Sequence, residues 1–130
     1  MYYNPNRQEI HKIKSKVYIA SKNGFTQDEY FNQIPTYDEP QMYMFNIQNV
    51  SQDSEIREFG ELSNSMKVAI IREKSKYLDK FKNFDAVYLD GATPKGELAN
   101  GDNANYRIYS VRNQNTSILV YFIKTVKNEG

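Results

Sequence analysis

The last strand-forming run of the chain, Ser117–Val126, is apolar on both of its faces. Successive side chains of an extended segment point to opposite sides. The two faces consist of Ile118, Val120 and Phe122 on one side and Leu119, Tyr121 and Ile123 on the other. Such a strand needs cover on both sides, so it is either central to a sandwich or barrel or packed against a partner. Tyr106–Arg112 precedes it across a short polar turn, and the pair predicts a hairpin.

Other short runs with period-two alternation extend this pattern upstream. Strands are predicted at Lys16–Ser21, Met42–Val50, Met66–Glu73 and Ala86–Leu89. Lys22–Gly24 predicts a turn, Phe25–Pro40 with its two prolines predicts irregular structure, and Thr93–Asn103 predicts a loop. Apolar spacing in Lys74–Phe84 predicts a short helical turn. We therefore expect a mainly β fold, a small antiparallel β-barrel or sandwich of about six strands with one short helix and a long loop.

A chain of 130 residues has room for one domain, and no composition shift divides it. We predict a single domain over 1–130, with a β-barrel core over 41–127. Residues 1–40 are expected to form an N-terminal extension that holds the first strand and is incompletely ordered. No apolar run approaches the length of a membrane span, and no targeting segment is evident, so we expect a soluble protein made in the cytoplasm.

Composition excludes several classes of site. The formal net charge is +1, which argues against a basic field over the whole surface. Cysteine is absent and His11 is the one histidine, so thiolate chemistry and multi-histidine metal sites are excluded. The acidic groups Glu55, Glu58 and Glu61, or Asp85 and Asp90, lie where solvated or turn carboxylates are ordinary. We accordingly predict no enzyme activity and no catalytic, cofactor-binding or metal-binding residues.

Charges of opposite sign separate along the chain although they cancel overall. Ser51–Gly60 is polar and acidic, and it predicts either a short helix capped by Ser51 or Asp53 or an extended loop. Basic residues crowd Lys67–Lys82, with Tyr77 and Phe81 between them, and a second group lies at Lys12, Lys14 and Lys16. Two hypotheses follow: single-stranded nucleic acid binding by stacking and phosphate contact, or head-to-tail self-association between the acidic and basic segments.

Several short motifs, taken in order, resemble the head-closure (stopper or neck) proteins of long-tailed phages of Gram-positive hosts. Asn46–Asp53 is similar to the strand and the Ser-Gln-acid start of their long loop. Phe59–Gly60 followed by Lys67–Ile70 is similar to the exit from that loop. Phe84–Gly91 with Pro94, and Asn105–Val111 with the closing apolar strand, resemble the rest of the family pattern. The likeness covers about two-thirds of the chain.

This resemblance implies a structural protein of the head–tail connector. It implies a homo-oligomeric ring, dodecameric or hexameric, below the portal and adaptor of the packaged virion and above the tail-completion protein, in contact with double-stranded DNA. A loop near Ser51–Ser65 would face the channel, with candidate residues Ser51, Gln52, Asp53, Glu55, Glu58, Phe59, Gly60 and Glu61. Candidate subunit-interface residues are Lys74, Lys76, Tyr77, Lys80, Phe81 and Lys82. The alternatives are a tail-completion or terminator protein and the nucleic-acid-binding barrel.

Overall fold

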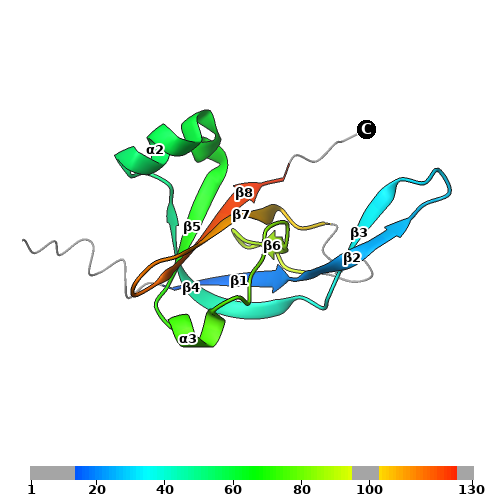
Figure 1. Cartoon of the computed structure of the whole chain (residues 1–130), viewed down its shortest axis with the longest axis horizontal. Coiled ribbons are helices and arrows are strands. Elements are labelled where there is room, and N and C mark those ends of the chain that lie inside the picture. Colours follow the sequence, from blue (N-terminus) through cyan, green and yellow to red (C-terminus); the bar gives the residue numbers. More distant parts are fainter. Residues whose placement is uncertain (1–13, 95–102, 126–130) are drawn as a thin grey trace, which may run out of the picture.

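Six antiparallel strands close into a small barrel in the computed structural model, which describes residues 14–94 and 103–125 (Figure 1). Around the barrel the strands follow the order β1-β4-β5-β8-β7-β6. Their bounds are β1 Ser15–Ala20, β4 Gln41–Asn49, β5 Met66–Ile71, β6 Ala86–Tyr88, β7 Tyr106–Asn113 and β8 Ile118–Lys124. The predicted fold class is confirmed, and of its two forms the barrel is the one observed. β1 pairs with both β4 and β6, so a strand within 1–40 is needed to close the barrel.

Strand β8 lies between β5 and β7 and is covered on both faces, as its sequence predicts. Ile118, Val120 and Phe122 point into the barrel core. Leu119, Tyr121 and Ile123 point outward into a second, smaller core, which is shared with Val50, Phe59, Met66 and Val68. The cover on the outer face comes from the segment between β4 and β5. The barrel therefore has an inner core and one buried outer patch.

One end of the barrel is closed by two aromatic side chains, one at the end of the short helix α3, Lys74–Tyr77, and one just after it. Tyr77 and Phe81 are buried and lie edge-on to Phe45, with ring centroids 5.2 and 5.9 Å from it. Asp79 adopts a left-handed backbone conformation (φ 60°) between them and turns the chain so that both rings face inward. The helical turn predicted over Lys74–Phe84 is present, but its regular part ends at Tyr77.

A second sheet, the hairpin of β2 (Lys22–Gln27) and β3 (Gln33–Tyr37), extends away from the barrel (Figure 1). The predicted turn at Lys22–Gly24 and the predicted irregular structure over Phe25–Pro40 are therefore wrong. Asn-Gly marks a register shift between Lys22 and Gly24 rather than a turn. Pro35 fits because a two-stranded sheet leaves one side of each strand unpaired, where a missing N–H costs no ladder bond.

The carboxylate of Asp85 joins three parts of the chain beside β6. Its two oxygens accept hydrogen bonds from the backbone N–H of Lys22 (2.9 Å) and of Lys82 (3.0 Å). Its backbone carbonyl accepts the N–H of Ile108 in β7 (2.9 Å). Burial raises the pKa of Asp85, and the two N–H donors oppose that shift. The hairpin base, the end of the α3 segment and the barrel wall thus meet at one buried group.

No helix within residues 14–94 and 103–125 is long and apolar enough to cross a membrane.

Phe81→Ala should lower the free energy of unfolding by about 3–5 kcal/mol, because it removes a buried ring from the barrel end and leaves a cavity. Leu78 lies in the same segment but is 47% exposed, and Leu78→Ala should change the free energy of unfolding by no more than about 0.5 kcal/mol. Urea unfolding followed by circular dichroism measures both. Equal costs for the two variants would mean that Phe81 does not seal the barrel.

Candidate functional site

The segment between β4 and β5 is a helical excursion, made of helix α2 (Asp53–Phe59) and the 3-10 helix η1 (Gly60–Ser65). Of the two predicted forms of Ser51–Gly60 the helix is the one observed, and the long loop expected over Ser51–Ser65 is helical. Asp53 and Glu55 in the first turn and Arg57 in the last complement the helix dipole. Gly60 ends α2 with a φ of 61°, a conformation that suits glycine.

The predicted N-cap was wrong. Neither Ser51 nor Asp53 caps α2; Gln52 occupies the cap position, and no side chain bonds there. The helix is instead stabilised from its other end, since Phe59 is buried against the barrel.

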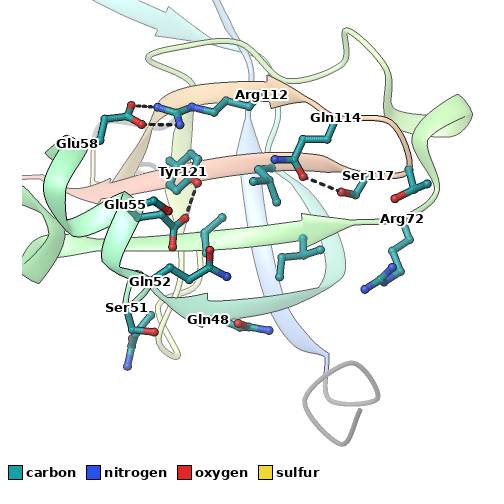
Figure 2. Close-up of a pocket in the computed structure, with 16 residues that line it drawn as sticks. Gln48, Ser51, Gln52, Glu55, Glu58, Arg72, Arg112, Gln114, Ser117 and Tyr121 are labelled. Atoms are coloured by element: carbon teal, nitrogen blue, oxygen red, sulfur yellow. Dashed lines mark hydrogen bonds and ion pairs between the residues drawn. The ribbon is translucent and has the colours of Figure 1, made fainter. Parts of the chain in front are cut away.

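Aromatic packing and two polar contacts attach the excursion to the outer face of β7 and β8. Phe59 packs on Tyr121 (5.0 Å between ring centroids) and on Tyr109 (5.9 Å). The Arg112 guanidinium lies over the rings of Phe59 and Tyr121, 5.2 and 5.0 Å from their centroids. Arg112 also donates two hydrogen bonds to the Glu58 carboxylate, and the Tyr121 hydroxyl donates one to Glu55 (Figure 2).

These contacts change the titration of the groups that make them. The hydrogen bond from Arg112 lowers the pKa of Glu58. Burial, and then the carboxylate of Glu55, raises the pKa of the Tyr121 phenol above its usual range. The excursion is therefore held to the barrel by a charged pair and by a phenol that stays protonated at neutral pH.

An open groove of about 580 Å³ runs between α2 and the barrel wall. Val68, Leu119 and Tyr121 contribute its apolar lining, while Gln48, Gln114 and the Glu58–Arg112 pair contribute polar groups (Figure 2). Two carboxylates line it, and both accept hydrogen bonds from the barrel, one at Glu55 and two at Glu58. Within the two described ranges, no three His, Cys, Asp or Glu side chains are grouped so as to hold a metal ion.

The predicted channel residues fall into two groups. Ser51, Gln52, Asp53, Gly60 and Glu61 are exposed. Glu55, Glu58 and Phe59 contact the barrel and fix the excursion in place. The other half of this contact, made by Arg112, Tyr109 and Tyr121, was not predicted from the sequence. The apolar outer face of the last strand was the available signal, but it did not identify the covering segment.

The predicted interface residues also fall into two groups, buried aromatic residues and lysines at the surface. Tyr77 and Phe81 belong to the barrel core and are 9% and 5% exposed, so they offer a neighbouring molecule almost no surface. Lys76, Lys80 and Lys82 are exposed, and Lys74 is partly exposed while its ammonium donates to the Gln114 carbonyl. Lys80 lies over the Tyr43 ring, 5.5 Å from its centroid. The lysines therefore form a basic surface, but the two aromatic residues between them, Tyr77 and Phe81, lie inside the barrel.

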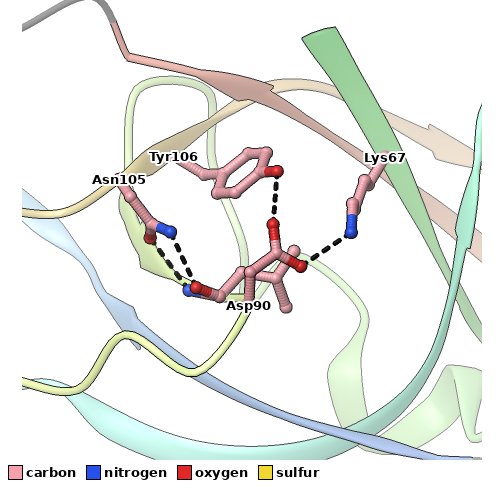
Figure 3. A network of polar contacts seen from close by, with 5 residues as sticks. Lys67, Asp90, Asn105 and Tyr106 are labelled. Atoms are coloured by element: carbon pink, nitrogen blue, oxygen red, sulfur yellow. Dashed lines mark hydrogen bonds and ion pairs between the residues drawn. The ribbon is translucent and has the colours of Figure 1, made fainter. Parts of the chain in front are cut away.

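The remaining carboxylate of interest, Asp90, is part of a structural network at the end of β6 (Figure 3). It accepts hydrogen bonds from Lys67 and from the Tyr106 hydroxyl, both at 2.7 Å. Burial alone would raise the pKa of Asp90, but these two donors outweigh burial and leave the pKa lowered. Asn105 holds the adjacent turn by bonding both the N–H and the carbonyl of Leu89. His11, Lys12 and most of the Thr93–Asn103 loop lie outside the described residues.

No protein-family model matches the sequence, and none of the curated proteins matches it. Among solved structures, the chain is similar to the solution structure of protein SF1141 from Shigella flexneri 2a, a structural genomics target. The TM-score is 0.58 at 14% sequence identity, over 89% of this chain and 96% of that chain. At this identity the likeness extends to the fold alone.

Raising the pH should reveal the buried phenol that anchors α2. Tyr121 should ionise above the ordinary tyrosine range of about 10, so the native state keeps a proton that the unfolded state loses. Stability should therefore fall as the pH rises above about 10. Ultraviolet titration should show a late ionisation step that is one tyrosine smaller in Tyr121→Phe, with the ordinary step unchanged. A smaller ordinary step and an unchanged late step would contradict the assignment.

Proposed function

We propose that this protein is a phage structural protein of the head–tail connector. Copies form a homo-oligomeric ring below the portal and adaptor, close the packaged head, and provide the surface on which the tail docks. The observation that carries the proposal is the α2–η1 excursion, which lies between β4 and β5 and projects from the barrel (Figure 1). It occupies the position in the chain where the phage resemblance implies a channel-facing segment.

The pairing of β4 with β5 does not need this excursion. β4 and β5 are antiparallel neighbours whose last paired residues, Asn49 and Lys67, lie opposite each other. A tight turn would suffice to join such strands. The chain instead carries two short helices there and covers an apolar patch on the barrel to hold them. An element that is fixed in position but not needed to pair β4 with β5 supports a role in contacts outside the subunit.

The charges of the excursion suit a place beside packaged double-stranded DNA. Glu55 and Glu58 are used to attach α2 to the barrel, whereas Asp53 and Glu61 remain exposed. In a ring, each copy would add these carboxylates to the same channel, and their fields would sum. A channel lined this way repels phosphate, so it can obstruct the genome without adhering to it. The place of action is then the virion, at the head–tail interface.

Burial of Tyr77 and Phe81 favours this proposal over single-strand nucleic acid binding. Stacking on bases requires aromatic faces that are open to solvent. The two aromatics of the lysine-rich segment instead contact Tyr43 and Phe45 inside the barrel end. An enzyme is not proposed, because four of the five candidate carboxylates are already engaged and Glu61 is exposed. Glu55 and Glu58 bond to the barrel, Asp85 to two backbone N–H groups, and Asp90 to Lys67 and Tyr106.

Deleting the gene from the phage that carries it tests the proposal directly. Negative-stain microscopy of the lysate should show heads that packaged and then lost DNA, beside free finished tails. Complementation with the wild-type gene should restore whole particles. Full, stable heads beside overlong or unfinished tails would assign the protein to tail completion instead. Normal infectious particles would exclude both roles.

Charge reversal on the excursion tests the channel assignment separately. Asp53→Lys with Glu61→Lys changes two exposed side chains and should alter the free energy of unfolding by no more than about 1 kcal/mol. Particles that carry this pair should release DNA more slowly, because the ring would attract phosphate. The isosteric pair Asp53→Asn with Glu61→Gln is the matched control and should give an intermediate rate. Equal release rates for all three proteins would remove the excursion from the channel.

A further inference from the structure

The hairpin β2–β3 contributes no strand to the barrel, and the aromatic side chains at its tip touch little of the protein. Tyr37, near its base, packs against the cluster of Ala20, Ala86, Tyr88 and Ala104. It is attached at its base, where the Asp38 N–H donates to the Ser21 carbonyl (2.8 Å) and the Lys22 N–H donates to Asp85. A two-stranded hairpin gains little stability on its own in water. It extends from the barrel as an arm (Figure 1), and a contact with another molecule would stabilise it further.

The tip of the arm is held in one conformation by Asp28. One oxygen of its carboxylate accepts the N–H groups of Tyr30 (2.8 Å) and Asn32 (2.9 Å), and the other accepts the Asn32 side-chain amide (3.1 Å). The hydrogen bond from the Asn32 backbone lowers the pKa of Asp28, so the carboxylate stays ionised. The tip is thus ordered without help from the barrel.

This ordered tip exposes two large aromatic side chains. Tyr30 is 75% exposed and Phe31 is 80% exposed. Phe31 also adopts a φ of 65°, a left-handed conformation that is rare for a bulky residue. Strained backbone held in place by its surroundings is concentrated at sites of binding. Phe25 on β2 is also exposed, at 55%, and extends the apolar surface along the arm.

The charge of the arm indicates what it binds. Residues 22–39 contain four carboxylates (Asp28, Glu29, Asp38 and Glu39) and one cation (Lys22). This excess of negative charge disfavours nucleic acid and favours a basic surface with an apolar centre. The same chain presents such a surface in the α3 segment, residues 72–82, which contains five cations and two carboxylates. Leu78 lies in that segment and is 47% exposed.

We propose that the hairpin tip of one copy docks on the α3 segment of a second copy, with Tyr30 and Phe31 packed near Leu78 and Glu29 facing Lys76 and Lys80. The tip and α3 lie on different sides of one subunit (Figure 1), so the contact is between molecules. Two different surfaces meet, which makes the contact heterologous, and repetition of such a contact closes a ring when the rotation permits. This inference rests on the proposed ring and names the contact that builds it.

Cysteine trapping tests the contact, because the chain has no cysteine of its own. One protein carries Gln33→Cys beside the tip and the other carries Ser75→Cys on α3; all other residues are native. Mixed and mildly oxidised, they should form a disulfide-linked dimer. The control replaces Ser75→Cys with Ser54→Cys, an exposed position on α2. Because Ser75 lies between two lysines and Ser54 between two carboxylates, each rate is divided by the rate at which that protein reacts with a small-molecule disulfide. The α3 pair should cross-link about tenfold faster than the α2 pair, the ratio that corresponds to about 1.4 kcal/mol.

A charge exchange shows whether the predicted partners meet. Glu29→Lys in the Gln33→Cys protein should lower the cross-linking rate, and Lys76→Glu with Lys80→Glu in the Ser75→Cys protein should lower it likewise. Combining the two changed proteins should restore the rate. Phe31→Gly should abolish fast cross-linking while leaving the thermal midpoint unchanged or higher, since glycine relieves the left-handed backbone. That result would separate loss of the contact from loss of the fold.

Equal cross-linking of the α3 and α2 pairs, or none with either, overturns the inference. Faster trapping by the α2 pair would place the tip on the acidic excursion and overturn it as well. These outcomes are distinct from failure of the proposed function. Specific trapping together with normal particles from the gene deletion would keep the contact and exclude the phage role. Emptied heads together with no trapping would keep the phage role and exclude the contact.

Discussion

The buried carboxylate of Asp85 is the interaction on which the arrangement of the molecule depends. It accepts the first N–H of the hairpin and an N–H from the end of the α3 segment, while its backbone accepts from β7. Removal of the acceptor would leave two partly buried N–H groups without a hydrogen-bond partner in the protein, which is destabilising. The Asp85 side chain therefore fixes the point where the β2–β3 arm leaves the barrel and the point where the chain returns to the barrel after Tyr77 and Phe81. Both surfaces proposed to meet between copies are positioned from this single point.

The predictable parts of the fold are those in which the spacing of apolar residues follows which side chains are buried. Both faces of β8 are apolar because one faces the barrel core and the other faces Phe59 and Met66. Tyr77 and Phe81 were found as apolar positions of a helical turn because they fill the barrel end. The hairpin was missed because neither strand has a buried face, so β2 and β3 carry no alternation to read. Its prolines and glycine then favoured an irregular segment.

Only the helical segment of the candidate site was predictable from the sequence; the barrel residues that hold it were not. The polar, acidic character of Ser51–Gly60 and the candidate N-caps Ser51 and Asp53 allowed the helix to be considered. The groups that hold this helix lie far along the chain, since Arg112 is 54 residues from Glu58 and Tyr121 is 66 residues from Glu55. No local pattern pairs residues over such distances. A carboxylate that anchors the helix therefore looks the same in sequence as one that faces solvent.

Closure of the barrel has a consequence for how the molecule meets its neighbours. Each of the six barrel strands has a neighbouring strand on both sides, although β4 and β7 are paired on only one side along much of their length. The segments that leave the barrel are therefore the main places where side chains can be presented to another protein. Those segments can change in sequence and length without disturbing strand register. The same barrel can thus be kept while its partners change, and the divergence between relatives should be concentrated in the arm and the excursion.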